Sequence, residues 1–405
     1  MKRFYAIFVV AMLLLSCTKG HDEVVVTMQP KRSTTISAEQ ALKNLYGELK
    51  LIDGQTRADG SQRTVKSIKS LTGAITRSGN ALDNDLLYIV EFDEGEGSAV
   101  LAADTRLDPV IAVLDSSVLT AEDFASTNED DINVYMASLI EDYAVCSSEI
   151  NSLPLIPVPD EYDTTYTFVG PFLNTKWHQR SPFNDLCYDE NGNKAVAGCS
   201  TIAAAQFIYY MKPNDEIIIN GTEINTSNFS SLRYGYTPSY NAKDKVSIFV
   251  LETGYAIDAD FGVSATSASL NDVANLLTDV MGYTHILGQY LPRIAENKLD
   301  VETPVIMQGS DIQNDGCHAW ILDGYYQGEV TTKKFTMDGG AETIYVGSVG
   351  KVHCNFGWGG LCDGYYVDNM FDTATRNYDI DSSVGDYTGN GGYNFSSRFW
   401  MINTD

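Results

Sequence analysis

Apolar and polar positions along the first third of the chain predict a helix, a small antiparallel sheet and a second helix. Ser37 begins a capping-box pattern, which predicts a helix from there to about residue 49. Residues 52–80 are rich in Ser, Thr, Gly, Arg and Lys and are predicted to form a loop or an accessible linker. Apolar runs between Gly and Asp clusters predict strands at 86–92, 99–103 and 110–114. Helical spacing then predicts one helix over 121–147.

A proline-rich segment marks a boundary after this first part. Pro154, Pro157 and Pro159 disfavour both a helix and a central strand, so residues 153–160 are expected to be extended. The second part opens with loops and is predicted to contain an apolar helix over 198–211 and another over 269–281. Strand-like runs follow at 304–308, 318–326, 343–356 and 364–368. Helices first and strands last predict an α+β fold with an antiparallel sheet.

The N-terminus has the pattern of a targeting segment. Lys2 and Arg3 precede a short apolar run over 4–15, which ends just before Ser16 and Cys17. This end resembles a bacterial lipoprotein signal, in which cleavage before Cys17 leaves that residue to carry a lipid; the alternative is an ordinary secretory signal with a chance Cys. We therefore expect residues 1–16 to be a signal peptide. The mature chain would be a cell-envelope lipoprotein, in the outer membrane or periplasm, with a polar tether up to residue 36.

Composition narrows the classes of function. The formal net charge of -27 would repel phosphate backbones, so nucleic acid is not an expected partner. No internal stretch approaches the roughly 18 apolar residues that a membrane span needs. Seven cysteines in 405 residues do not form a disulfide scaffold, and no CxxC pair suggests zinc, so no metal or cofactor is expected. The sequence does not decide whether Cys354 and Cys362 form a disulfide bond.

A possible nucleophile begins the apolar helix at 198–211. Cys199 lies at its first turn, where the helix dipole favours thiolate and should lower the pKa of the thiol. The alternative is a small Cys packed in a core. A nucleophilic Cys needs a base, and five His are present, although a lone His is more often structural. The arrangement carries more weight, because Gln179, Cys199, His318 and Asn355 follow one another in Gly- or aromatic-rich settings.

Four segments around these residues resemble the streptopain family of papain-like cysteine peptidases. Their order and spacing both match, and they read WHQRSPFN at 177–184, AGCSTIAAAQ at 197–206, GCHAWILDGY at 316–325 and HCNFGWGG at 353–360, followed by DGYY at 363–366. The resemblance covers about residues 166–402. It extends more weakly to residues 100–106, which resemble the propeptide of the family.

The resemblance implies a role for each matched residue. Cys199 is the nucleophile, and His318 is its base and later the acid that protonates the leaving amine. Asn355 orients the imidazole, and Trp358 shields the His–Asn contact from water. Gln179 donates to the oxyanion together with the backbone N–H of Cys199, a kind of contact that contributes about 3–4 kcal/mol.

Three residues depart from the usual family pattern. Phe356 stands where Trp is usual and lacks the indole N–H donor. Ser200 follows the nucleophile where an apolar residue is more common, and Cys317 precedes the histidine and is open to oxidation. None of these removes a catalytic group. Residues 254–268 resemble a family loop near the substrate cleft, although they also fit a plain surface loop.

The sequence therefore predicts an exported cysteine endopeptidase made as a zymogen. Residues 17–160 would form the tether and an inhibitory α+β propeptide domain, and residues 161–405 a papain-like catalytic domain. The expected partners are protein or peptide substrates, the chain's own propeptide, an activating protease, and the membrane through lipidated Cys17. Cleavage between about residues 148 and 168 would then also release the enzyme. The alternatives are an inactive papain-like binding lipoprotein and an acyl transferase of the transglutaminase type.

Overall fold

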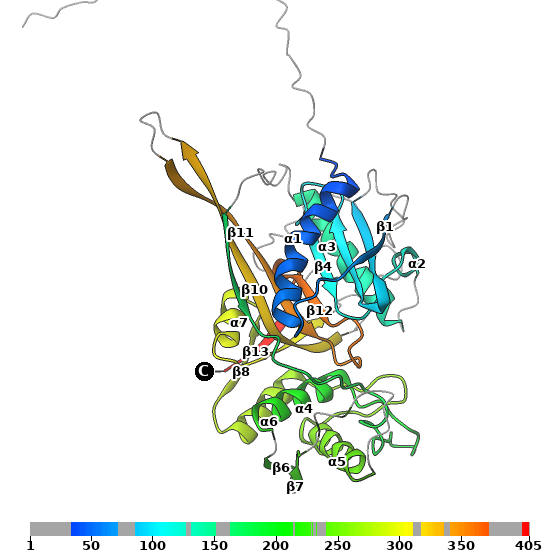
Figure 1. Cartoon of the computed structure of the whole chain (residues 1–405). Coiled ribbons are helices and arrows are strands. Elements are labelled where there is room, and N and C mark those ends of the chain that lie inside the picture. The colour runs from blue at the N-terminus through cyan, green and yellow to red at the C-terminus, as the bar shows by residue number, and fades with distance from the viewer. Residues whose placement is uncertain are drawn as a thin grey trace, which may run out of the picture. The chain divides into compact units, whose positions relative to one another are not determined.

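A computed structural model gives the fold (Figure 1). It describes residues 34–71, 86–126, 131–150, 163–213, 215–227, 229, 232, 240–310, 317–335, 341–371 and 399–404. The predicted signal segment, most of the predicted tether and the proline-rich segment lie outside the described residues. Among the helices that are described, none combines the length and the apolar character needed to cross a membrane.

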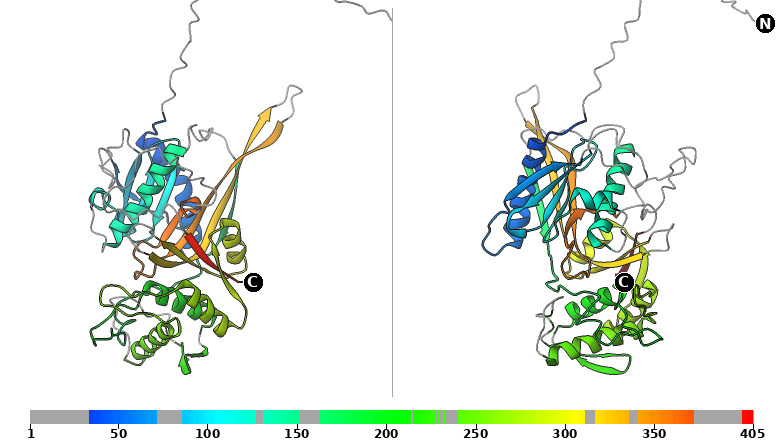
Figure 2. Two further views of the ribbon diagram at one scale, coloured as in Figure 1. Left: turned by 180° about the vertical axis from the view of Figure 1, so that it is seen from behind. Right: turned by 90° about the vertical axis from the view of Figure 1, so that its right-hand side faces the viewer.

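The first part of the chain forms an α+β domain. Helix α1 (Ala38–Thr56) begins as predicted, because the Ser37 hydroxyl accepts a hydrogen bond from the backbone N–H of Gln40 at 3.2 Å. The following elements are β1 (Val65–Ser70), β2 (Leu87–Phe92), a 3-10 turn (Asp93–Gly95), β3 (Ser98–Ala102), β4 (Val110–Leu114), α2 (Ala121–Ala125) and α3 (Ile132–Ile150). Helices α1 and α3 lie on opposite faces of β3 and β4 (Figure 2). All residues of both strands are consequently buried.

The second part is built around a buried helix. Helix α4 (Cys199–Met211) has apolar residues around most of its circumference, and it packs against α5 (Tyr240–Ala256), α6 (Leu270–Met281) and strand β10 (Cys317–Phe335). Helix α6 begins at the predicted cap, since the Ser269 hydroxyl accepts from the N–H of Asn271 at 3.2 Å. The remaining elements apart from the main sheet are the hairpin of β6 (Glu216–Ile219) and β7 (Thr222–Asn225), helix α7 (Pro292–Leu299) and a 3-10 turn (Asp368–Met370).

One antiparallel sheet runs through both parts of the chain. Its order is β1-β2-β3-β4-β12-β11-β10-β9-β13-β8, and β5 (Asp163–Val169) also pairs with β10. The strands of the second part are β8 (His285–Gln289), β9 (Val305–Ser310), β10, β11 (Ala341–Asn355), β12 (Gly364–Val367) and β13 (Phe399–Thr404). The α+β architecture and the antiparallel sheet predicted from the sequence are confirmed. The continuity of the sheet across the two parts was not predicted.

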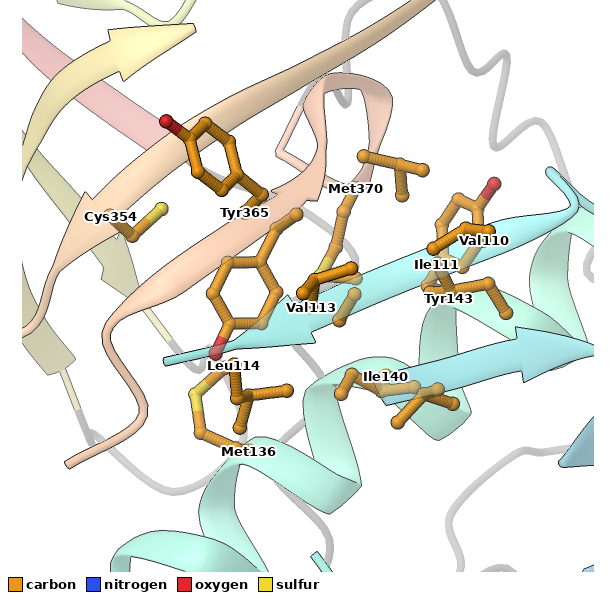
Figure 3. Close-up of a cluster of buried hydrophobic side chains, with 14 of the residues drawn as sticks. Val110, Ile111, Val113, Leu114, Met136, Ile140, Tyr143, Cys354, Tyr365 and Met370 are labelled. Carbon is orange, nitrogen blue, oxygen red and sulfur yellow. The ribbon is translucent and has the colours of Figure 1, made fainter. Parts of the chain in front are cut away.

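The two parts meet where β4 pairs with β12, with Val113 opposite Tyr365. Side chains from β4, α3, β11 and β12 share one apolar cluster there (Figure 3). Its labelled members include Val110, Leu114, Met136, Ile140, Cys354 and Tyr365. Because this cluster is fully buried, separating the two parts would expose a large apolar surface to water.

Polar groups also join the two parts. The backbone N–H of Asp115, just after β4, donates to the Asp363 carbonyl at 2.9 Å. Glu48 in α1 forms an ion pair with Lys351 in β11 at 2.7 Å, where the Lys side chain is only 3 % exposed. A charge buried at an interface needs such a partner, so each part supplies groups that the other leaves unsatisfied.

Three predictions for the first part are wrong in detail. Residues 52–56 continue α1, and residues 65–70 form β1, where a loop or linker over 52–80 was expected. Strand β1 is polar because it is half exposed at the edge of the sheet, where β2 is its one partner among the described strands. The expected helix over 121–147 is two helices, since Ser126 has extended backbone. The end of the expected tether is bound to the first domain, because the carbonyl oxygen of Thr34 accepts a hydrogen bond from the backbone N–H of Thr105 at 2.7 Å.

Candidate active site

Cys199 is the first residue of α4, and a glycine controls the entry to this helix. Gly198 has a φ of 90°, a conformation that side-chain-bearing residues rarely adopt. A Cβ atom on Gly198 would lie 2.9 Å from Thr266 Cγ2, so the segment around Thr266 packs directly on the residue before the predicted nucleophile. The Thr266 hydroxyl donates to the Val196 carbonyl at 2.7 Å. The loop expected at 254–268 therefore packs beside Cys199 through Thr266, although its first residues, 254–256, are the end of helix α5.

The thiol of Cys199 is less acidic in this state than its place at a helix N-terminus suggests. Burial raises the pKa of the Cys199 thiol, and hydrogen bonds from the backbone N–H groups of Ala319 and Ser200 offset this effect only in part. The sequence-based expectation of a lowered pKa is therefore wrong for this state. The physical reason is that loss of water outweighs the favourable dipole of α4.

His318 lies in β10 among aromatic rings. Its imidazole stacks on the indole of Trp358, with centroids 4.2 Å apart and planes at 21°. Its Nε2 lies 3.1 Å from the carbonyl oxygen of Phe356, which can only accept a hydrogen bond, so Nε2 carries the proton. Burial lowers the pKa of His318 to about 3, although the Phe356 bond opposes this shift. The imidazole is therefore neutral, with Nδ1 unprotonated and able to act as a base.

Asn355 is held by groups other than His318. Its Nδ2 donates to the Thr175 carbonyl at 2.9 Å. Its Oδ1 accepts from Gln206 Nε2 and from the Gly357 N–H, both at 3.2 Å. Within the described residues no hydrogen bond joins Asn355 to His318, and the oxygen that holds the imidazole belongs to the Phe356 backbone. The Phe side chain at this position, which departs from the family pattern, is not what makes that bond.

Gln179 is brought beside Cys199 by its backbone. Its carbonyl accepts from the N–H of Ala197 at 2.9 Å, two residues before the nucleophile. On the other side, His178 forms a β-bridge with Trp358. One short segment therefore ties the predicted oxyanion donor both to the start of α4 and to the tryptophan that covers His318.

The alternation of side chains along β10 separates the surroundings of the two reactive groups. Ala319 and Ile321 pack into the apolar cluster that contains α4 and contacts Cys199. His318 and Trp320 stack on the other side, among residues shared with the first part of the chain. In the described part of the chain no hydrogen bond links the Cys199 sulfur to His318. This state therefore contains no thiolate–imidazolium pair.

A residue of α3 contacts His318, the predicted catalytic base. The ring of Tyr135 lies edge-on to His318, with centroids 5.9 Å apart, and edge-on to Trp358 at 5.5 Å. Edge-to-face contacts of this kind are favourable aromatic pairs. The first part of the chain thus helps to keep water away from His318, which is the cause of its lowered pKa.

A cluster of charges around the buried His353 lies at the junction of the two parts and was not predicted. His353 Nδ1 is 2.6 Å from Asp323, and its Nε2 is 3.3 Å from Asp115, which belongs to the first part. Burial alone would lower the pKa of His353, but the two carboxylates outweigh it and raise that pKa to about 10. Nearby, Lys176 pairs with Asp363 at 2.9 Å. Sequence spacing gave no signal for this cluster.

Two further predictions concern cysteines and metals. Cys187, Cys199, Cys317, Cys354 and Cys362 are free thiols, so the bridge between Cys354 and Cys362 that the sequence left open is not formed. Cys354 and Cys362 are fully buried, and Cys317 is exposed. Among the described residues no group of His, Cys, Asp and Glu is arranged to hold a metal ion.

The residues that the sequence marks as catalytic thus lie around the contact of helix α4 with strand β10, with Cys199 and His318 in separate surroundings on the two sides of that strand. This fold and this junction define the class, which is a cysteine protease whose N-terminal domain is still attached. Residues 177–366 match the model of the peptidase C10 family, the streptopain family, so this part of the chain is a domain of that family. The chain is therefore a cysteine protease with a zymogen-like organisation.

Relatives match both parts of the chain. Streptopain from Streptococcus pyogenes serotype M1 is 22% identical over 368 residues, which covers 78% of this chain and 80% of that protein. The structure of a prointerpain A fragment from Prevotella intermedia matches with a TM-score of 0.53 and 19% identity, covering 83% of this chain and 98% of that one. The second match shows a shared fold that includes the region before the catalytic domain.

Proposed function

We propose that this protein is an exported cysteine endopeptidase whose N-terminal domain, within residues 17–160, inhibits it until cleavage. The observation that carries the proposal is the contact of Tyr135 with the stacked rings of His318 and Trp358. It links a helix outside the matched catalytic segment to the residue that must act as the base. Peptides or proteins are the substrates.

The proposed chemistry uses the residues in the roles set out from the sequence. His318 Nδ1 takes the proton of the Cys199 thiol, and the thiolate attacks the peptide carbonyl carbon. The oxyanion accepts hydrogen bonds from the Gln179 amide and the Cys199 N–H. The imidazolium then protonates the leaving amine, which leaves an acyl-enzyme. Water, deprotonated by His318, attacks this thioester and releases the new carboxyl group and the thiol.

Burial explains why the uncleaved protein would be inactive. A pKa of His318 near 3 and a raised pKa of Cys199 both favour the neutral pair over thiolate and imidazolium. Departure of α3 would admit water around His318 and Trp358. Because water stabilises both charged forms, the pKa of His318 would rise, the pKa of Cys199 would fall, and the reactive ion pair would form.

We further propose that activation and release from the membrane are one event. The lipid would be attached to Cys17, which lies on the inhibitory side of the expected cleavage region, between about residues 148 and 168. A cut there by an activating protease, or by another copy of the enzyme, would free the catalytic domain from the envelope. If the cleaved catalytic domain stays with the membrane fraction in the absence of other partners, this proposal is wrong.

The test of function compares residues 18–405 with the Cys199→Ala variant, before and after limited proteolysis near residue 160. Hydrolysis of an unfolded protein substrate should appear only in the cleaved wild type under reducing conditions. Rapid alkylation of Cys199 by a thiol-directed active-site probe should appear in the same sample. The Ala variant controls for a contaminating protease.

Two outcomes would replace the proposal with its alternatives. A cleaved wild type that is as inert as Cys199→Ala and shows no fast alkylation would indicate a binding lipoprotein on a protease scaffold. Incorporation of an added amine into the substrate at a rate above hydrolysis would indicate acyl transfer, because the same acyl-enzyme can be captured by an amine instead of water.

A further inference from the structure

A buried amide on the helix of the nucleophile has no role in the chemistry described so far. Gln206 is fully buried in α4, where nearly all other residues are apolar. It lies seven residues after Cys199, which is about two helical turns, so both side chains lie along the same side of the helix. A buried amide is costly unless its donors and acceptor are used, so its partners indicate what it does.

Gln206 is part of a closed ring of three hydrogen bonds. Its Nε2 donates to Asn355 Oδ1 at 3.2 Å, Asn355 Nδ2 donates to the Thr175 carbonyl at 2.9 Å, and the Thr175 hydroxyl donates to Gln206 Oε1 at 2.6 Å. All three residues are at most 3 % exposed. The ring joins helix α4, the end of β11 and the segment that leads to Gln179.

The directions of these bonds are fixed by backbone groups. The Thr175 carbonyl can only accept and the Gly357 N–H can only donate, so Asn355 must place Nδ2 on the first and Oδ1 on the second. Gln206 must then present its NH₂ group to Asn355 Oδ1. Its remaining oxygen accepts the Thr175 hydroxyl. No other assignment of the two amides satisfies every atom of the ring.

The fixed orientation of the Asn355 amide in turn fixes the peptide group that binds His318. Its Oδ1 closes a turn with the Gly357 N–H, and this turn encloses the Phe356 peptide group whose carbonyl binds His318 Nε2 at 3.1 Å. Gly357 has a φ of 69°, and a Cβ there would lie 3.0 Å from Ile202 in α4. The turn therefore packs directly on the same helix side that carries Gln206.

We propose that Gln206 is a positioning residue for catalysis: through Asn355 it fixes the Phe356 carbonyl that orients His318 relative to the helix that bears Cys199. The carbonyl keeps the proton on Nε2 and leaves Nδ1 free to receive the thiol proton. It also stabilises the imidazolium of the ion pair. This inference rests on the catalytic roles proposed for Cys199 and His318.

The test uses proteolytically activated enzyme and the variant Gln206→Met, which keeps the length of the side chain but removes its donors and its acceptor. We expect kcat to fall by about 10- to 100-fold with KM within about twofold, since the reacting groups lose alignment but the cleft is unchanged. The alkaline limb of the pH profile for Cys199 alkylation should shift to lower pH. Loss of the ordered carbonyl makes the imidazolium easier to deprotonate.

Matched variants separate positioning from folding. Thr175→Val should reproduce the kcat loss because it removes the hydroxyl that holds Gln206, and Thr175→Ser should restore it. Thr201→Val is the control in the same helix, since the Thr201 hydroxyl is buried and has no hydrogen-bond partner among the described residues. It should leave kcat and the alkaline limb unchanged. Circular dichroism and thermal unfolding confirm that each variant is folded.

The inference is overturned if folded Gln206→Met and Thr175→Val both keep the kcat and the alkaline limb of the wild type. It is also overturned if Thr175→Ser loses as much kcat as Thr175→Val. If the activated wild type itself shows no Cys199-dependent hydrolysis and no fast alkylation, the proposed function has failed. That result is distinct, because it appears before any variant is compared.

Discussion

The ring of Tyr135 in α3 lies edge-on to the imidazole of His318 in β10, with centroids 5.9 Å apart. The same tyrosine lies edge-on to Trp358, whose indole stacks on the His318 imidazole. This contact joins the N-terminal domain to the residue proposed above as the catalytic base. It gives the inhibition proposed above a definite physical origin, which is the exclusion of water from a titrating group.

The first prediction concerns this contact. Tyr135→Ala in the uncleaved protein should admit water beside His318 and raise the rate of Cys199 alkylation at neutral pH by about tenfold, because each lost ring pair contributes about 0.5–1.5 kcal/mol. Quantitative mass spectrometry of the Cys199 peptide measures the rate. Tyr46→Ala, which removes an exposed tyrosine of α1, serves as the control and should leave the rate unchanged. Equal rates in both variants would show that Tyr135 does not keep the site latent.

The second prediction concerns pH. The pKa of His353 is raised to about 10 by Asp323 and Asp115 against the effect of burial, whereas its pKa in the unfolded chain is near 6.5. A raised pKa stabilises the folded state fully below the unfolded value and loses that effect as pH rises through the folded value. The difference in free energy of unfolding between the uncleaved protein and His353→Gln should therefore be largest near pH 6 and shrink toward pH 10.

Urea unfolding of both proteins in a Cys199→Ala background, which prevents self-digestion, measures this difference. His21→Gln, outside the described residues, is the control for removal of a histidine from the predicted tether and should show no such trend. A difference between wild type and His353→Gln that stays constant from pH 6 to pH 10 would contradict the prediction.

The third prediction separates two demands on Gly198. Gly198→Ala places a Cβ 2.9 Å from Thr266 Cγ2 at a φ of 90°, whereas Gly192→Ala has a φ of 79° but no atom within 4 Å of the new Cβ. Both variants strain the backbone, and only the first also forces the segment around Thr266 away from the nucleophile. We expect Gly198→Ala to lose about 1–3 kcal/mol more stability than Gly192→Ala. Denaturant unfolding measures both, and equal losses would show that the segment yields freely.

The fourth prediction concerns the thiols. Cys317 is exposed, whereas Cys354 and Cys362 are buried and burial raises the pKa of both. An alkylating reagent should therefore label Cys317 in the native protein and leave the other two unlabelled until denaturation. Peptide mapping identifies the labelled residues. A disulfide-linked peptide that contains Cys354 and Cys362 would show that the free thiols are not the form in solution.

The sequence determined the class of protein. The order of Gln179, Cys199, His318 and Asn355 within their segments led to the streptopain family, which the family match confirms. The helix starts at Ser37 and Ser269 were also predicted correctly, because capping depends on residues that are close in the sequence. Each serine side chain accepts a hydrogen bond from a nearby backbone N–H group. The apolar runs that became β2, β3 and β4 are buried strands because their hydrophobic residues need cover.

Contacts between distant parts of the chain decided what the sequence could not. Strand β1 is polar and gave no strand signal, because its neighbour in the sheet rather than its own composition makes it a strand. The Cys199 pKa is raised although a helix N-terminus should lower it, since burial by the tertiary fold outweighs the local dipole. Neither the Asp115–His353–Asp323 cluster nor the Phe356 carbonyl on His318 follows from spacing along the chain. Their energies depend on desolvation and on atoms brought together only by folding.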